Sequence, residues 1–187
     1  MFDHGFYELG FNRTRRRRRR LRPRAVLVFA TLGIALLGYA FLVRPTPLVI
    51  YNGSASARLG FYLVRHAGQI RRGDLVLVKT PKSVRLLAAE RHYLPLNVDL
   101  VKRVVALKGD RVCAVKGIVS VDGYAAAKQL KADREGRRLP EWNGCQTLGN
   151  GEVFLLMESV PDSFDSRYFG PVPIASIIGG LTPLWLK

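Results

Sequence analysis

The chain has 187 residues, of which 48% are hydrophobic and 24% charged, and its net charge is +16. This composition supports a packed core and excludes wholesale disorder, and the length predicts one main domain with accessory segments. The charge is uneven, because nine arginines lie within residues 1–24 against Asp3 and Glu8, so that this short segment carries +7.

An uncharged segment of nineteen residues, Ala25–Val43, follows the arginines directly. As a helix that rises about 1.5 Å per residue, it is long enough to cross the hydrocarbon core of a bilayer. Arginines crowd its N-terminal side, whereas the other side has a lone Arg44 followed by Pro45 and Pro47, so the positive-inside rule predicts a cytoplasmic N-terminus. The expected parts are a basic cytoplasmic segment (1–24), a transmembrane anchor (25–43) and an exported, periplasmic domain (44–187).

The N-terminal region has two alternative interpretations. A cleaved signal peptide has a shorter apolar segment and a small-x-small cleavage site, and no such site precedes the prolines. A run of arginines can also bind nucleic acid, but its position beside an apolar span favours a topology determinant. We therefore expect a single-pass, uncleaved anchor in the cytoplasmic membrane, in contact with lipid and without a nucleic-acid partner.

The remainder of the chain has the pattern of a mainly β domain, in which short segments rich in branched and aromatic residues alternate with Gly-Asp and Asp-Gly turn signals. The expected strands are Leu48–Tyr51, Gly60–Val64, Asp74–Lys79, Val98–Leu107, Arg111–Val115, Ile118–Val121 and Glu152–Glu158.

Two other segments of this domain have different patterns. Helical spacing predicts one helix from Lys82 to Tyr93, with Ser83 as its cap and Pro95 just beyond its end. Residues 123–149 are polar and punctuated by glycine, which predicts an irregular insertion or flap.

The two cysteines of the chain, Cys113 and Cys145, both fall in the predicted exported domain. An oxidising compartment permits a disulfide, which would stabilise the fold by roughly 3 to 4 kcal/mol through the unfolded state. The sequence leaves two buried free thiols as the alternative, with the disulfide favoured.

Several common catalytic signatures are absent from the sequence, including the P-loop, His-Glu-x-x-His, Cys-x-x-Cys and Gly-x-Ser-x-Gly. A Ser-His-Asp triad needs a histidine beside its serine, yet His4 is predicted to lie across the membrane, and His66 and His92 have no catalytic context. We therefore expect no metal and no cofactor.

A serine protease can use lysine as its base if burial lowers the pKa of the amine. In the segment Val98–Leu107, strand alternation puts Lys102 on a face with apolar residues. By periodicity alone, such a lysine is more often an edge residue whose amine reaches solvent. The motifs around Lys102 favour the catalytic interpretation.

Four motifs resemble, in order, the conserved boxes of type I signal peptidases, the S26-like Ser-Lys superfamily. They are Ser54-Ala-Ser56-Ala-Arg-Leu-Gly60-Phe-Tyr62, Arg72-Gly73-Asp74, Lys102-Arg103-Val-Val-Ala-Leu-Lys-Gly109-Asp110 and Ser163-Phe-Asp165-Ser166-Arg167-Tyr-Phe-Gly170. The short domain, the stretch Ala89-Glu-Arg-His-Tyr-Leu-Pro95 and the Asp-Ser-Arg-Tyr-Phe-Gly-Pro ending resemble most closely the TraF-type peptidases of conjugative transfer. The resemblance implies a signal-peptidase-like antiparallel β catalytic domain with one short helix, preceded by a single N-terminal transmembrane helix.

The resemblance also implies roles for individual residues. Ser56 would be the nucleophile and Lys102 its general base, while the Ser56 backbone N–H and the Ser54 hydroxyl would form the oxyanion hole. The alternative for Ser54 is a turn hydroxyl that bonds to local backbone. One departure from the family stands at Arg58, where proline is usual and would stiffen the turn.

A third serine, Ser163, and the charged residues Asp165 and Arg167 would support the site. Ser163 would orient the lysine, and Asp165 and Arg167 resemble the pair that supports it, although in the TraF type the aspartate is also thought to be required. Because a carboxylate near Lys102 would favour the charged amine unless Arg167 neutralised it, we assign Asp165 and Arg167 to the architecture of the site and not to proton transfer.

The expected function is that of a membrane-anchored Ser-Lys endopeptidase that acts on the outer face of the cytoplasmic membrane, in conjugative transfer. Its partner would be an exported precursor or a pilin subunit, and the sequence leaves open whether water or a substrate amine, which would cyclise the product, resolves the acyl-enzyme. The alternatives are a LexA-like self-cleaving repressor, disfavoured by the anchor, and a non-catalytic bitopic component of a secretion or conjugation machine.

Overall fold

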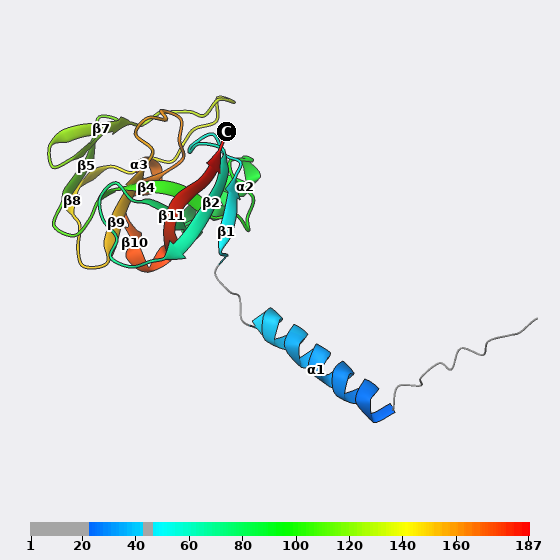
Figure 1. Ribbon diagram of the computed structural model, residues 1–187. Coiled ribbons are helices and arrows are strands. Elements are labelled where there is room, and N and C mark those ends of the chain that lie inside the picture. The colour runs from blue at the N-terminus through cyan, green and yellow to red at the C-terminus, as the bar shows by residue number, and fades with distance from the viewer. Residues whose placement is uncertain (1–22, 43–46) are drawn as a thin grey trace, which may run out of the picture. The chain divides into compact units, whose positions relative to one another are not determined.

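The computed structural model describes residues 23–42 and 47–187 (Figure 1). The chain divides into an N-terminal unit up to Pro45 and a C-terminal unit that begins at Thr46. Residues 1–22 and 43–46, which include most of the predicted basic cytoplasmic segment and the start of the predicted exported domain, lie outside the described residues.

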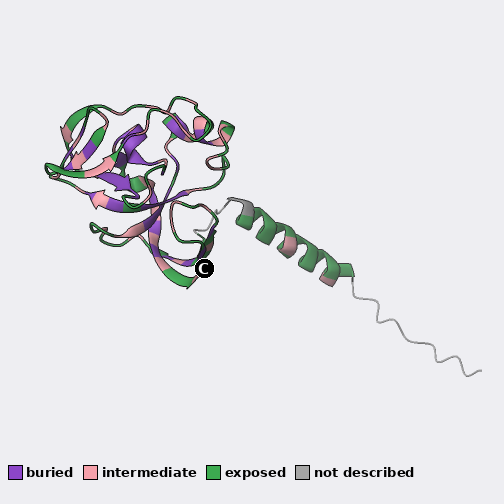
Figure 2. Cartoon of the chain, turned by 90° about the horizontal axis from the view of Figure 1, so that it is seen from above, coloured by how far each residue is buried: buried purple, intermediate pink, exposed green. Residues whose placement is uncertain are grey.

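The N-terminal unit contains one apolar helix, α1 (Pro23–Leu42), which begins two residues before the predicted start. Proline suits the first position of a helix because its fixed φ is helical and its missing N–H would have no partner there. Apolar side chains surround the helix, and nearly all of its residues with described side chains are exposed (Figure 2). Within the described residues, α1 alone is long and apolar enough to cross a membrane. The predicted N-terminal apolar helix is confirmed.

The C-terminal unit is built from two antiparallel sheets. The larger has the order β1-β2-β11-β3-β4-β9-β10 and the smaller has the order β7-β6-β5-β8. The strands are β1 (Val49–Asn52), β2 (Gly60–His66), β3 (Leu75–Val78), β4 (Leu100–Ala106), β5 (Arg111–Val115), β6 (Ile118–Val121), β7 (Tyr124–Lys128), β8 (Gly144–Thr147), β9 (Glu152–Leu156), β10 (Val172–Pro173) and β11 (Ile177–Leu186).

The larger sheet buries apolar side chains on both of its faces. Val76, Val104 and Leu155 belong to the cluster on one face, and Leu77 and Val101 belong to the cluster on the other. The smaller sheet contributes to a third cluster, in which its apolar side chains pack against β9 residues such as Phe154. Strand β4 lies between β3 and β9 in the larger sheet, so the segment that carries Lys102 is buried on both faces.

Four strands were not predicted, namely β7, β8, β10 and β11. The long strand β11 lies between β2 and β3 but contains Gly179, Gly180 and Pro183, which weaken a strand signal. Glycine is required at position 179, because a Cβ there would come within 2.4 Å of the Arg65 carbonyl oxygen. The prediction of an irregular segment at 123–149 is wrong at its ends, which form β7 and β8, while the residues between them contain one isolated bridge.

The helices also differ in detail from the prediction. Helix α2 (Lys82–Glu90) ends three residues early, and its N-cap is Pro81, so the predicted capping role of Ser83 is wrong. A second short helix, α3 (Ser166–Phe169), was not predicted. Asp165 caps α3 by accepting a hydrogen bond from the Arg167 N–H. With these corrections, the predicted mainly β, antiparallel fold is confirmed.

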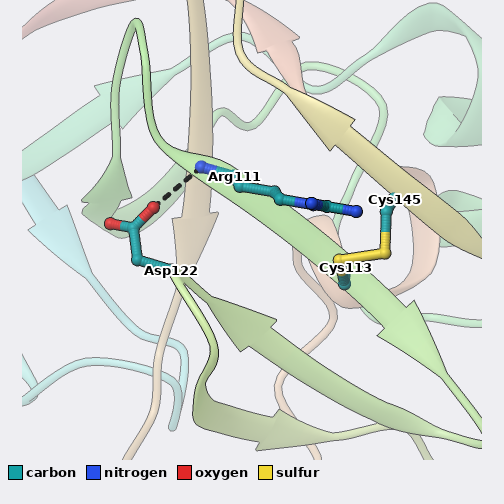
Figure 3. Close-up of a disulfide and its surroundings, with 4 residues drawn as sticks. All are labelled: Arg111, Cys113, Asp122 and Cys145. Carbon is teal, nitrogen blue, oxygen red and sulfur yellow. Dashed lines mark hydrogen bonds between the residues drawn. A yellow bond between two sulfur atoms is a disulfide. The ribbon is translucent and has the colours of Figure 1, made fainter.

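A disulfide joins Cys113 on β5 to Cys145 on β8 (Figure 3). The two residues are direct cross-strand partners, with Cα atoms 4.0 Å apart. The bridge therefore ties the end of the insertion to the smaller sheet, and the favoured prediction for the cysteines is confirmed.

Candidate active site

A cleft of about 1020 Å³ opens on the C-terminal unit. Its walls come from the turn after β1, from residues 91–102 and from the insertion and the segment before α3. Ser54, Ser56, Lys102 and Ser163 all line it, whereas Asp165 and Arg167 are buried and do not. The structure thus brings four of the six predicted site residues to one cleft and puts the charge pair outside its lining.

The turn that carries Ser56 is organised by a buried side chain, Asn52. Its amide nitrogen donates to the carbonyl oxygens of Ser54, Ala57 and Arg58 at 3.0, 3.1 and 3.2 Å. Its amide oxygen accepts hydrogen bonds from the backbone N–H and the hydroxyl of Ser54, at 3.2 and 2.9 Å. Asparagine is suited to this task because its side chain can bond to the backbone two residues further along. Asn52 therefore fixes the backbone on both sides of Ser56.

The far end of the same turn is held by Tyr62 and Gly60. The Tyr62 hydroxyl donates to the Arg58 carbonyl oxygen at 2.7 Å. Gly60 has a φ of +146°, and a Cβ there would meet the Trp185 carbonyl oxygen at 2.1 Å. Hydrogen bonds from Asn52 and Tyr62 thus fix the backbone at Arg58, the position at which the resemblance led us to expect proline.

Ser54 and Ser56 are in contact through their hydroxyls, whose oxygens lie 3.0 Å apart. Because the Ser54 hydroxyl also donates to Asn52 Oδ1 at 2.9 Å, it is part of the local turn. An oxyanion role would require this hydroxyl to rotate away from Asn52.

Lys102 is almost completely buried on β4, with 2% of its surface exposed. Burial disfavours the charged amine and lowers its pKa from the ordinary 10.5 to about 8. The negative charge of Asp165 acts in the opposite direction, and the positive charge of Arg167 partly offsets it. An amine in this state has a substantial neutral fraction near pH 8 and can accept a proton.

The Lys102 amine donates a hydrogen bond to Ser163 Oγ at 2.8 Å, and both groups are buried. The hydrogen bonds of the described residues do not include one between Lys102 and Ser56. The two side chains face the same cleft, and catalytic hydrogen bonds are often long until substrate is bound. The amine is therefore oriented by Ser163.

Asp165 and Arg167 form a buried bidentate ion pair. Arg167 Nε donates to Asp165 Oδ1 at 2.7 Å, and Nη2 donates to Oδ2 at 3.0 Å. Arg167 also donates to the carbonyl oxygens of Met157 and Pro161, and the Met157 N–H donates to Asp165. The pair therefore holds in place the segment between Met157 and Pro161, which leads to Ser163.

The remaining predicted motifs connect and close turns of the C-terminal unit. Arg72 forms ion pairs with Asp110 and Asp122, which connects the Arg-Gly-Asp turn to two other turns. Asp110 accepts a hydrogen bond from the Leu107 N–H at 2.7 Å and closes its own turn. Neither the Arg72-Gly73-Asp74 turn nor the turn at Gly109-Asp110 lines the cleft.

Sequence reasoning missed two residues of the site. Asn52 stands before Gly53 and Ser54, and its tendency to form such side-chain turns was the available signal. Asp99 also lines the cleft, three residues before Lys102, and no sequence signal distinguished it from a surface carboxylate.

Comparisons with known proteins show the family to which the chain belongs. Residues 21–185 match the family described as signal peptidase, peptidase S26. Two proteins from Escherichia coli described as plasmid transfer protein TraF are 41% and 33% identical to the chain, over 71% and 83% of its length and 80% and 89% of theirs. A conjugal transfer protein TraF from Agrobacterium fabrum is 33% identical, over 72% of this chain and 80% of its own. The chain belongs to the signal peptidase S26 family.

Proposed function

We propose that this protein is a membrane-anchored Ser-Lys endopeptidase that processes exported precursors. The observation that carries the proposal is the buried amine of Lys102, whose pKa is lowered to about 8 and which lines one cleft with Ser56. A desolvated lysine beside a serine is the arrangement that lets an amine act as general base.

The reaction would begin when neutral Lys102 accepts the proton of the Ser56 hydroxyl as Oγ attacks the carbonyl carbon of the substrate. The Ser56 backbone N–H, and the Ser54 hydroxyl after its rotation, would donate to the oxyanion. Collapse of the tetrahedral intermediate breaks the peptide bond, and the leaving amine takes the proton from Lys102. Water, or an amine of the substrate, then attacks the acyl-enzyme and releases Ser56.

Ser163, Asp165 and Arg167 would position these groups without contact with the reacting atoms. Ser163 holds the amine at 2.8 Å, and the Asp165–Arg167 pair holds the segment that carries Ser163. Arg167 partly offsets the effect of the Asp165 charge on Lys102, whose pKa stays lowered to about 8.

The place of action would be the outer face of the cytoplasmic membrane. Helix α1 is apolar and long enough to span a bilayer, and the arginines of residues 1–24 favour a cytoplasmic N-terminus. In the C-terminal unit, Tyr51, Phe61 and Trp185 form an exposed aromatic row across β1, β2 and β11. Aromatic residues favour the interface between membrane and water.

The substrate class would be a precursor in plasmid transfer, such as a pilin subunit. This part of the proposal is supported by the TraF relatives, whose names refer to plasmid or conjugal transfer. An extended peptide would fit along the cleft and present its scissile bond near Ser56.

The test is the processing of a candidate pilin precursor by membranes that carry wild type, Ser56→Ala or Lys102→Met, with insertion checked for each. The proposal predicts that both variants insert normally and leave the precursor uncleaved. Processing at the wild-type rate by either variant would contradict it and favour a non-catalytic bitopic component.

A further inference from the structure

Asp99 is the unpartnered carboxylate of the cleft. Four carboxylates line it, and three are paired: Asp133 with Tyr93 and Arg137, Glu135 with Arg137, and Asp162 with Arg134. Within residues 23–42 and 47–187, no hydrogen bond or ion pair reaches the side chain of Asp99. The other three carboxylates of the cleft wall each have a basic partner, whereas Asp99 is available to a ligand.

The surroundings of Asp99 make a bound cation favourable. The residue is half-buried, and burial raises the pKa of its carboxyl, which means that the charged form lacks full solvation. Lys79 and Arg85 are the positive groups that act on it, but neither lies within ion-pair distance. Arg85 instead donates to the Thr80 carbonyl oxygen at 2.8 Å, and Lys79 is exposed. A cation in the cleft would therefore gain the partner that the fold does not supply.

Asp99 lies at a defined place relative to the reacting groups. It stands three residues before Lys102, next to Leu100 at the start of β4, so the two Cα atoms are separated by at most roughly 10 Å. The charges that act on the Lys102 pKa are those of Asp165 and Arg167, and both Asp99 and Lys102 line the cleft. An extended substrate advances by the same length per residue.

We propose that Asp99 selects a lysine or arginine side chain of the substrate that lies within about three residues of the scissile bond. The inference rests on the proposed function, because it assumes that an extended peptide occupies the cleft. Asp99 forms an ion pair with the ammonium or guanidinium group and sets the register of the peptide against Ser56.

Binding can be measured without catalysis. Full-length Ser56→Ala protein in detergent micelles is titrated with fluorescent Ala/Ser-rich peptides that carry one central Lys, Glu or Ala. We expect the Lys peptide to bind about tenfold more tightly than the Ala peptide and the Glu peptide to bind most weakly. When Asp99→Asn is added, the Lys and Ala peptides should bind with equal affinity. Asp99→Lys should make the Glu peptide the tightest-binding ligand.

The matched control is Glu90→Gln in the same background, which removes one exposed carboxylate at the end of α2, outside the lining of the cleft. It should retain the full preference for Lys, and thermal unfolding should show that all variants are folded. Equal affinity for the three peptides, no binding of any of them, or a Lys preference that survives Asp99→Asn would each overturn the inference.

A second readout tests the register and separates this inference from the proposed function. In a precursor that wild type cleaves, one Lys is moved along the sequence, and processing should be fastest when it lies within about three residues of the cut. Loss of processing in Ser56→Ala together with indifference to the position of the Lys would uphold the protease and reject the role of Asp99.

Discussion

Lys102 Nζ donates to Ser163 Oγ at 2.8 Å, in a part of the C-terminal unit where both side chains are at most 3% exposed. The contact joins β4 to the segment before α3, two parts of the chain that lie 61 residues apart. Ser163 holds the amine in place, and the low exposure of Lys102 lowers its pKa. The orientation and the protonation state of the base therefore depend on different neighbours and can be tested separately.

Ser163→Ala should slow processing by about tenfold to a hundredfold, because the amine loses the partner that orients it. The amine stays buried, so the pH at which activity reaches half of its maximum should stay near 8. Rates across a pH series measure both quantities, and Ser120→Ala on the smaller sheet is the control. An unchanged rate would show that Ser163 does not position the base.

The pH dependence of wild type should follow the Lys102 amine. Since its pKa is lowered to about 8, the neutral fraction and the rate should rise with pH and level off above that value. Lys102→Arg should be inactive throughout, because a guanidinium keeps its proton. A rate that is flat between about pH 6 and 9 would contradict the assignment of Lys102 as base.

Lys102→Met should be more stable than wild type at neutral pH. The folded pKa lies below the unfolded value of 10.5, so the unfolded state binds the proton more tightly and folding of wild type becomes more favourable as pH rises from about 8 to 10.5. The difference in melting temperature between the two proteins should therefore shrink over that range. A variant that is less stable than wild type at neutral pH would show that Lys102 stabilises the fold.

Asn52→Ala should reduce processing strongly while the rest of the fold persists. The side chain makes five hydrogen bonds within the turn that carries Ser56, and their loss should cost about 1 to 3 kcal/mol locally. The Lys102 amine is untouched, so the pH profile should keep its midpoint while the maximal rate falls. Wild-type activity in Asn52→Ala would mean that Tyr62 and Gly60 suffice to shape the turn.

Asp165→Asn tests whether Asp165 only supports the structure of the site or also takes part in proton transfer. It leaves the Arg167 guanidinium buried without its charge partner, which should destabilise the protein by about 3 to 5 kcal/mol. Because the negative charge of Asp165 raises the Lys102 pKa, its removal should move the activity midpoint to lower pH. If the folded variant is instead inactive at every pH, Asp165 itself takes part in the reaction.

Much of the fold could be predicted because most of its strands are segments rich in branched and aromatic residues. Strand β4 has branched residues on both sides of Lys102, and the hairpin between β5 and β6 is compact in sequence. Strand β11 could not be predicted, since Gly179 is required by its close contact with β2, which is distant in the sequence. The Ala-rich β7 has low intrinsic strand propensity and forms because β6 pairs with it.

The candidate site could be predicted only where family motifs marked it. Ser56, Lys102 and Ser163 were expected, and the structure lines one cleft with them. The role of Asn52 depends on how a turn folds back over its side chain, and the free carboxylate of Asp99 depends on which neighbours fail to reach it. Neither is a property of a local sequence pattern.

The central claim is that Ser56 attacks the substrate with Lys102 as its base, and the most direct measurement is mass spectrometry of the acid-quenched enzyme during processing of a precursor. We predict an acyl adduct on the Ser56 peptide in wild type that is absent in Lys102→Met. An adduct on another residue, or one that forms on Ser56 at the wild-type rate in Lys102→Met, would contradict the claim.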